Sequence, residues 1–362
     1  MISECLKERA LPAVWPDKNV PFEIRRNELV RILEEQEYGK VRREVKSVSY
    51  ETVYEDPKYL ASKGSFKKVM IRLVLQETDG RGEDSFSFPV TVILPRREGK
   101  HPFVVHISFM FTEPGYDPPV EEMLEQGIAY LGFNYQEVTR DDRASALRLG
   151  EHTDGIYPLL NAGQEDDPAG KIAVWAWAAS RVLDYAATLP ELDMSRAAVA
   201  GHSRLGKTAL VAGMEDPRFQ YIFANASGAG GAALFRGMRG EKLEDLVRVF
   251  PYWFNRKFAS YVDRTPELPY DQHFLIAACA PRKVYVGAGD DDLWADEQSM
   301  YLAHAAASEV YEALGRKGFI AADRLPETGD VFTAGDLGFH LRHGAHYLAR
   351  EDWLHFLSFM NT

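Results

Sequence analysis

The chain has 362 residues, 46% of them hydrophobic, which is enough material for a sizeable buried core. Its formal net charge is −12, with acidic and basic residues interspersed, so we expect no basic surface for nucleic acid or for an anionic membrane. No stretch approaches the roughly 20 apolar residues of a transmembrane helix. The composition therefore argues against a nucleic-acid-binding protein and against a membrane protein.

Two features bear on the cellular compartment. Cys5 and Cys279 stand far apart and outside any metal-binding spacing, so we expect two reduced thiols. The N-terminal residues include no apolar signal segment, which predicts a cytoplasmic protein if Met1 is the native start. If a leader has been removed, a secreted or periplasmic protein is expected instead.

The apolar pattern predicts strands and helices that alternate along most of the chain. Residues 1–60 are expected to form a charged, helical lead-in. Strands are expected at residues 70–76, 88–95, 102–110, 129–136, 197–203, 221–227 and 283–289. Helices are expected at residues 171–189, directly after Ser203, at 296–315 and at the C-terminus. Such alternation is typical of a mostly parallel sheet with helices on both faces, which holds its chemistry at the carboxyl ends of the strands.

A nucleophilic serine is predicted in the segment AAVAGHSRLGKTAL, residues 197–210. Ser203 stands between a buried strand and a helix, and Gly201 and Gly206 allow the close approach that such a sharp turn needs. The start of the helix and the backbone N–H of Arg204 would then face an oxyanion. The second glycine follows the serine by three residues, not by two as in the common G-x-S-x-G pattern, and a structural turn is the alternative.

The segment GHSRLGKTAL resembles the G-C-S-R-x-G-K-x-A signature of the glucuronoyl esterases. These are carbohydrate esterases of the α/β-hydrolase type that cleave esters of 4-O-methyl-glucuronic acid on xylan. Further blocks similar to that family follow in the same order: SGAGGAALFRG (227–237), FPYWF (250–254), LPYDQHFLIAACAPR (268–282), DLWAD (292–296) and GFHLRHGAHYLAREDW (338–353). The resemblance covers roughly residues 100–360 and implies an α/β-hydrolase fold, a three-layer sandwich around a mostly parallel sheet. We expect a single domain over residues 1–362, with the hydrolase core at 61–362.

Three histidines compete for the role of general base in HLRHGAH: His340, His343 and His346. His346 matches the catalytic histidine of the family, His340 is expected to be structural, and His343 is expected to be exposed. The spacing also allows a metal site, but no further cluster of Cys, Asp or Glu supports one. We therefore expect neither a metal nor another cofactor.

The acid of the predicted triad departs from the fungal pattern. Fungal members have a glutamate immediately before S-G-A-G-G, where this chain has Ala226. Asp292, in the loop after strand 283–289, fits best and matches the position that bacterial members use; Asp291 is the alternative. Asp290 and Asp296 are expected to be loop or helix-capping carboxylates. The acid would hold the tautomer of the histidine without taking its proton.

The resemblance also implies contacts with a substrate. Arg204 would aim its guanidinium at the oxyanion, Lys207 and Glu241 would contact sugar hydroxyls, and Trp294 would lie near the 4-position of the sugar. Lys207, Glu241 and Trp294 each have a structural alternative: a solvated lysine, a carboxylate at a helix start, and a packed tryptophan. The aromatic run 250–254 is expected to pack rather than to bind.

Three further features stay open at this stage. His202 replaces the cysteine of the signature, which joins a disulfide beside the site in fungal members. Gln272 and His273 belong to a block that lies close to the site in the family. Residues 137–170 are long, polar and irregular, and are a candidate for a wall of the pocket.

The main interpretation is a serine esterase that cleaves esters of (4-O-methyl-)glucuronic acid on xylan-derived saccharides through an acyl-enzyme. An acetylxylan esterase is the first alternative, because the triad would be the same. A catalytically weak saccharide-binding homologue is the second, suggested by Ala226. The expected partner is a small-molecule or oligosaccharide ester, and the sequence does not predict the oligomeric state.

Overall fold

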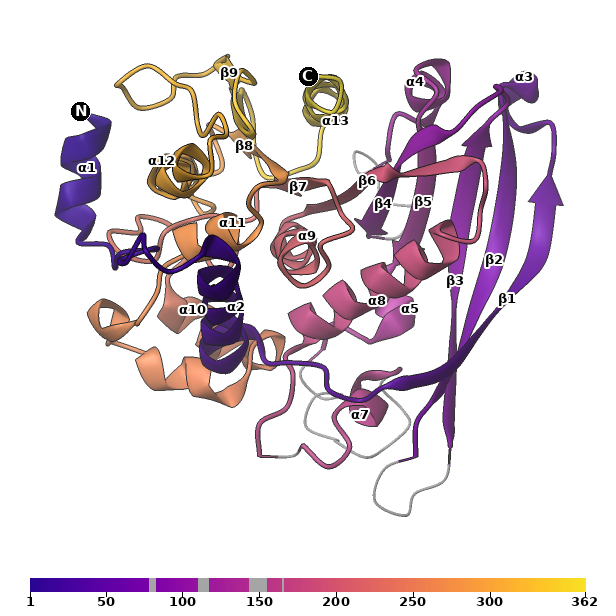
Figure 1. Ribbon diagram of the computed structural model, residues 1–362, viewed down its shortest axis with the longest axis horizontal. Helices are drawn as coiled ribbons and strands as arrows, with labels where there is room; N and C mark the ends of the chain where they lie inside the picture. The colour runs from indigo at the N-terminus through magenta and orange to yellow at the C-terminus, as the bar shows by residue number, and fades with distance from the viewer. Residues whose placement is uncertain (78–82, 110–116, 143–154, 165) are drawn as a thin grey trace.

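A ten-stranded sheet organises the fold, with the strand order β1-β2-β3-β5-β4-β6-β7-β8-β10-β9. The computed structural model describes residues 1–77, 83–109, 117–142, 155–164 and 166–362 (Figure 1). The strands are β1 (Val45–Asp56), β2 (Gly64–Leu75), β3 (Asp84–Pro95), β4 (His101–Ser108), β5 (Ala129–Asn134), β6 (Leu192–His202), β7 (Tyr221–Asn225), β8 (Lys283–Gly289), β9 (Val331–Phe332) and β10 (Leu337–Arg342).

The α-helices and short helical turns lie between and around these strands. They are α1 (Ile2–Arg9), α2 (Phe22–Leu33), η1 (Glu34–Tyr38), α3 (Tyr59–Ser62), α4 (Val120–Glu125), α5 (Tyr135–Val138), α7 (Tyr157–Leu160), α8 (Lys171–Ala186), α9 (Arg204–Glu215), α10 (Leu243–Val249), η2 (Pro251–Trp253), η3 (Arg256–Tyr261), η4 (Thr265–Glu267), α11 (His273–Ala278), α12 (Glu297–Ala313) and α13 (Arg350–Phe359). Among the described residues, no helix is long and apolar enough to span a bilayer.

The middle of the sheet is parallel and its margins are antiparallel. Strands β5, β4, β6, β7, β8 and β10 pair in parallel, whereas β1, β2 and β3 extend the sheet antiparallel on one side and β9 does so on the other. All eight residues of β4 are buried, as is expected where helices cover both faces of a strand. The parallel strands consequently end at one common edge.

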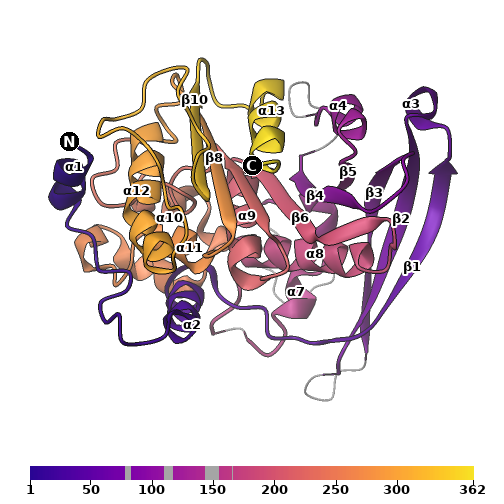
Figure 2. The ribbon, with the colours of Figure 1, turned by 45° about the horizontal axis from the view of Figure 1, so that its top comes forward.

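Helices form a layer on each side of the sheet. Helices α4 and α13 lie on one face, and α8, α9, α11 and α12 lie on the other (Figures 1 and 2). Two separate clusters of buried apolar side chains correspond to these two layers. The expected α/β-hydrolase sandwich with a mostly parallel sheet is confirmed.

The expected elements are present, and three strands, β1, β9 and β10, are added to them. The seven expected strands correspond to β2 to β8, several of which end one or two residues earlier than expected, and the expected helices correspond to α8, α9, α12 and α13. The sequence did not predict β10, and the expectation of helix over residues 1–60 is wrong for residues 45–56, which form β1. Both cysteines are free thiols, which fits either compartment considered above.

The N-terminal lead-in packs on the same core as the sheet. The Arg26 guanidinium donates to the carbonyl of Met214 in α9 at 2.6 Å and to that of Ala278 in α11 at 2.9 Å. The Asn255 amide donates to the carbonyls of Glu34 and Glu35 at 3.1 and 2.9 Å. These contacts fasten residues far apart in the sequence, and we propose that the whole chain unfolds as one domain.

A buried carboxyl group lies at this junction. Glu37 is fully buried in η1, and the Gln272 amide donates to both of its oxygens at 2.9 Å. Burial raises the pKa of the Glu37 carboxyl to about 8, although the hydrogen bond from Gln272 lowers it. The folded protein therefore retains a proton that the unfolded chain releases above the ordinary pKa of glutamate.

Replacing Glu37 by Gln is expected to stabilise the protein increasingly as pH rises from about 5 to about 8, the range between the unfolded and folded pKa values. The wild-type free energy of unfolding falls across this range by up to about 1.4 kcal/mol per pH unit, and glutamine removes that term. Calorimetric melting at pH 5 and pH 8 measures the effect. Equal Tm differences at both pH values would contradict the assigned titration, and two separate transitions would contradict the single domain.

Candidate active site

Three expected residues meet where neighbouring parallel strands end. Ser203 directly follows β6, Asp292 lies in the loop after β8, and His346 lies in the loop after β10. The Ser203 hydroxyl lies 2.9 Å from His346 Nε2, and His346 Nδ1 lies 2.5 Å from a carboxylate oxygen of Asp292. This is the hydrogen-bonded order of a nucleophile, a base and an orienting acid.

The backbone at Ser203 has an unusual conformation. Its φ is 56° and its ψ is −124°, in a region that L-residues seldom adopt. The Ser203 N–H donates to the carbonyl of Asn225 at 2.8 Å, which anchors the turn to the end of β7. A Cβ at Gly201 would lie 2.1 Å from the carbonyl oxygen of Leu205, so only glycine lets β6 and α9 meet this closely. The sharp turn predicted from the sequence is therefore present.

A second histidine packs against His346. The His202 ring centre lies 4.6 Å from that of His346, and His202 Nδ1 donates to the Asn225 side-chain oxygen at 2.6 Å. Burial lowers the pKa of the His202 imidazole to about 3, so this ring is neutral at physiological pH. The position that carries a cysteine in the signature is therefore filled by an uncharged ring packed against the imidazole of His346.

The four aspartates after β8 differ in exposure and in hydrogen-bond partners. Asp292 is 5% exposed and bonds His346, whereas Asp291 is exposed. Asp290 accepts hydrogen bonds from Thr328 and from the Gly344 backbone N–H. Asp296 caps α12 by accepting from the Ser299 N–H at 3.0 Å. Of the four, Asp292 has the geometry of a triad acid.

Arg204 is held by a carboxylate and surrounded by aromatic rings. Its Nη1 forms an ion pair with Asp141, whose other oxygen accepts from Trp253 Nε1 at 2.7 Å. The guanidinium carbon lies 5.1 to 5.8 Å from the ring centres of Phe109, Phe250 and Trp253. Burial lowers the pKa of Arg204, but the charge and hydrogen bond of Asp141, together with Tyr135 and Tyr252, outweigh it and raise that pKa above its ordinary value. Arg204 therefore stays charged, and its buried Nε–H has no hydrogen-bond partner among the described residues.

A pocket of about 190 Å³ opens beside Ser203. Six of the seven expected site residues line it, namely Ser203, Arg204, Lys207, Glu241, Trp294 and His346. Phe250, Trp253 and Ala226 line it as well. Phe250 and Trp253 do pack, with stacked rings whose centres lie 3.8 Å apart, and the same two residues also form part of the pocket wall.

Lys207 and Glu241 are paired at the base of this pocket. Lys207 is 4% exposed, and its Nζ donates to the Ser227 carbonyl at 2.7 Å and lies 3.6 Å from a Glu241 oxygen. Burial lowers the pKa of Lys207, although Glu241 raises it. Lys207 is therefore a buried, paired lysine and not the solvated surface lysine of the alternative. Trp294 is 55% exposed and its backbone carbonyl accepts from the Glu241 N–H at 2.9 Å.

Other expected residues lie outside the pocket lining. Gln272 bonds Glu37, and His273 Nε2 bonds the Pro12 carbonyl at 3.0 Å. His340 is fully buried and bonds Asp352, and His343 is exposed, as expected for both. Asp290, Asp291 and His343 have potential ligand atoms within 4.8 Å of one another, but Asp290 is already occupied by the hydrogen bonds described above.

Sequence reasoning missed Asp141. It belongs to the polar segment 137–170, of which residues 143–154 and 165 lie outside the described part. In the described part of this segment, Asp141 reaches the site through its ion pair with Arg204, and neither Asp141 nor helix α7 is among the residues that line the pocket. The signal that could have pointed to Asp141 is Arg204, because a buried arginine needs a nearby carboxylate to compensate for its lost hydration.

Comparison with known proteins identifies the chain's relatives. A family model described as fungal glucuronyl esterase matches residues 78–315. A 4-O-methyl-glucuronoyl methylesterase of Podospora anserina is 31% identical over 74% of this chain and 54% of that protein. A protein named carbohydrate esterase MZ0003, from an unknown prokaryotic organism, is 43% identical over 52% of this chain and 44% of that protein. The chain thus spans about half the length of these curated relatives.

Solved structures match the chain over nearly its whole length. A glucuronoyl esterase from Solibacter usitatus superposes with a TM-score of 0.84 at 30% identity, over 97% of each chain. A glucuronoyl esterase from Teredinibacter turnerae superposes with a TM-score of 0.83 at 26% identity, over 98% of this chain and 89% of that one. The family match, the fold and the order of the site residues agree, and the chain belongs to the glucuronoyl esterase family of α/β-hydrolases.

Proposed function

We propose that this protein hydrolyses esters of (4-O-methyl-)glucuronic acid on xylan-derived saccharides. The observation that carries the proposal is the hydrogen-bonded chain Ser203–His346–Asp292 at the edge of a pocket that also holds Arg204 and the Lys207–Glu241 pair. A volume of about 190 Å³ is small for a drug-sized ligand and suits a single sugar ring. The names of the relatives support the same substrate class.

Acylation begins at Ser203. Its Oγ attacks the ester carbonyl carbon while its proton passes to His346 Nε2, 2.9 Å away. Asp292 holds the other imidazole nitrogen and stabilises the imidazolium that forms. The C–O bond to the alcohol then breaks, and the alcohol oxygen takes the proton from His346. The uronic acid is left as an acyl group on Ser203.

Deacylation repeats these steps with water. His346 takes a proton from the water, whose oxygen attacks the acyl carbon. Collapse of the second tetrahedral intermediate breaks the bond to Ser203 Oγ, which recovers its proton from His346. The products are the free uronic acid and the regenerated serine.

Arg204 would stabilise the oxyanion of both intermediates. Its backbone N–H begins helix α9, where the helix dipole favours negative charge. Its side chain keeps a full positive charge beside Asp141, and its Nε–H is a donor without a partner among the described residues. A donor oriented in advance costs little reorganisation when charge develops on the carbonyl oxygen.

The remaining lining residues would hold the sugar. Lys207 and Glu241 present a buried donor and a buried acceptor to hydroxyl groups, and Trp294 offers an exposed ring against a sugar face. The acetylesterase alternative is less favoured, because an acetyl group would leave most of this polar lining without partners. The weak saccharide-binding alternative is also less favoured, since Asp292 occupies the place of an acid despite Ala226.

The proposal is tested by comparing kcat/KM of the purified protein on benzyl glucuronate and on para-nitrophenyl acetate. We expect a clear preference for the uronate ester, because that substrate engages Lys207 and Glu241, and no turnover of either by Ser203→Ala. A higher kcat/KM on para-nitrophenyl acetate would instead indicate a deacetylase. Wild-type rates in Ser203→Ala would contradict the whole scheme.

The triad acid is tested by a pair of adjacent variants. Asp292→Asn is expected to lower kcat by about 10³- to 10⁴-fold, because an amide misorients the histidine tautomer. Asp291→Asn should leave kcat near the wild-type value, since that side chain is exposed. Steady-state kinetics on benzyl glucuronate distinguish them, and the reverse order of effects would assign the role to Asp291.

The sugar contact is tested at Lys207. Lys207→Met is expected to raise KM for benzyl glucuronate by about 10- to 100-fold, the range for loss of a charged hydrogen bond. KM for para-nitrophenyl acetate should change much less. Lys242→Met, at an exposed lysine nearby, is the matched control and should leave both KM values unchanged. A similar rise for both esters would indicate a structural rather than a binding role for Lys207.

A further inference from the structure

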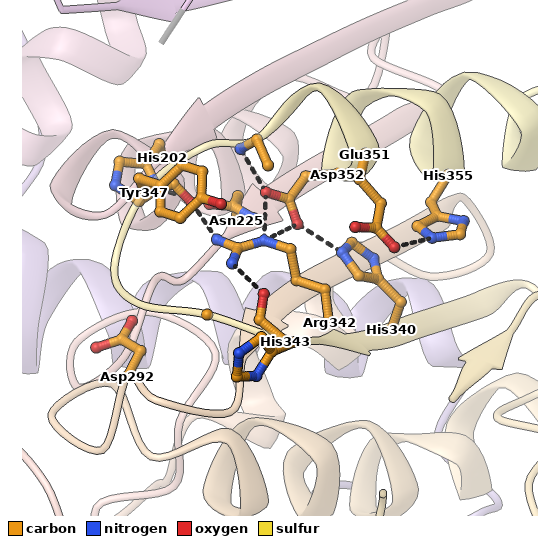
Figure 3. A network of polar contacts seen from close by, with 12 residues as sticks. His202, Asn225, Asp292, His340, Arg342, His343, Tyr347, Glu351, Asp352 and His355 are labelled. Atoms are coloured by element: carbon orange, nitrogen blue, oxygen red, sulfur yellow. Dashed lines mark hydrogen bonds and ion pairs between the residues drawn. The ribbon is translucent and has the colours of Figure 1, made fainter. Parts of the chain in front are cut away.

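A buried ion pair lies beneath the loop that carries His346. Arg342, the last residue of β10, is 3% exposed, and Asp352, in the first turn of α13, is fully buried. Arg342 Nε lies 3.0 Å from each carboxylate oxygen of Asp352 (Figure 3). Such a pair is costly to bury unless its remaining donors and acceptors are also satisfied.

The remaining donors of Arg342 are directed at the histidine loop. Nη1 donates to the carbonyl of His343 at 3.1 Å, and Nη2 donates to that of Tyr347 at 2.6 Å (Figure 3). Nη2 also donates to the carbonyl of Ala345 at 3.1 Å. The guanidinium carbon also lies 4.2 Å from the centre of the Tyr347 ring. The bonded carbonyls bracket His346, so one rigid, planar group fixes the backbone on both sides of it.

Asp352 holds the far end of the same loop. Besides Arg342, it accepts from His340 Nε2 and from the backbone N–H of Ala349, both at 2.6 Å. Ala349 follows His346 by three residues and is the N-cap residue of α13. The His340 and Arg342 contacts keep the pKa of Asp352 below its ordinary value, even though burial raises it. The carboxylate therefore remains ionised and the pair remains charged.

The loop that carries Asp292 is joined to this assembly. The Asp291 N–H donates to the Gly344 carbonyl at 3.1 Å, and the Gly344 N–H donates to Asp290 at 2.8 Å. A Cβ at Gly289 would lie 2.3 Å from the Gly344 carbonyl oxygen, so the two loops touch backbone to backbone. Displacing the histidine loop would therefore also disturb the acid loop.

From these contacts we infer that Arg342 is a positioning residue for the reaction: its guanidinium, neutralised by Asp352, fixes the carbonyls around His346 so that the imidazole reaches both Ser203 and Asp292. The inference rests on the proposed esterase function. It goes further by assigning catalytic geometry to a side chain that does not line the pocket. A displacement of about 1 Å can cost about 100-fold in rate.

The test is chemical rescue of Arg342→Ala. We expect kcat to fall by about 100-fold while KM changes by less than about twofold, because the sugar contacts are untouched. Millimolar guanidinium chloride, far below denaturing concentrations, should then restore part of kcat by entering the vacated site. A role confined to stability would show no such rescue, and kcat per folded molecule, with folding followed by near-ultraviolet circular dichroism, would equal the wild-type value. Either result would overturn the inference.

Arg282→Ala is the matched control. Arg282 is also buried, and it donates to the backbone carbonyls of Asp216 and Phe219 at 3.1 Å, just before β8 and at the opposite end of that strand from Asp292. This variant is expected to lose stability but to keep its kcat and to show no response to guanidinium. An equal rescue of both variants would contradict a specific role of Arg342.

Arg342→Lys keeps the inference testable if Arg342→Ala does not fold. Lysine retains the charge facing Asp352 but cannot reach three carbonyls in one plane, so the fold should persist with a lowered kcat. An unchanged kcat would overturn the inference. Para-nitrophenyl acetate serves as the reporter if the uronate ester is not turned over, provided that Ser203→Ala is inactive on it. Failure of the proposed substrate is thereby distinguished from failure of the role of Arg342.

Discussion

The close meeting of β6 and α9 at Gly201 is the constraint on which the site depends. It places Ser203 in a positive-φ conformation that costs on the order of 1–3 kcal/mol and presents the hydroxyl at the edge of the sheet. The bond from the Ser203 N–H to the Asn225 carbonyl and the burial of β6, β7 and α9 offset this cost. Once the serine is fixed, the parallel strands β8 and β10 end at the same edge, so the loops that follow them deliver Asp292 and His346 to it.

Paired charges surround this edge. Arg204 is bonded to Asp141, Lys207 faces Glu241 and Arg342 is bonded to Asp352. Every one of these cations is mostly buried, and a carboxylate within ion-pair distance compensates for its lost hydration. The pairs lie between different elements, so each also fixes the relative position of segments distant in the sequence.

The sequence predicted most strands and the three triad residues, but it did not predict the contacts between distant segments that complete the site. The strands with continuous apolar runs were predicted because burial on both faces leaves a local signal. Strand β10 was missed because its buried His340 and Arg342 look polar, and the carboxylate that satisfies them comes from α13. Strand β1 was missed because it is an exposed edge strand rich in charged residues. The positions of Ser203, Asp292 and His346 followed from motifs, whereas Asp141 and the pocket walls at Phe250 and Trp253 depend on contacts that no local pattern reveals.

The backbone bonds between the acid loop and the histidine loop have a mechanical consequence. They make the two loops one body, hinged to β8 and β10, while Ser203 belongs to the rigid turn between β6 and α9. The contact between His346 and Asp292 lies within this pair of loops. The contact between His346 and Ser203 joins the pair of loops to the turn between β6 and α9. A small displacement of this body would leave the bond between His346 and Asp292 intact and would change mainly the distance between His346 Nε2 and Ser203 Oγ. In the proposed reaction, the imidazole would thus approach the serine oxygen and then the departing alcohol while it keeps its carboxylate partner.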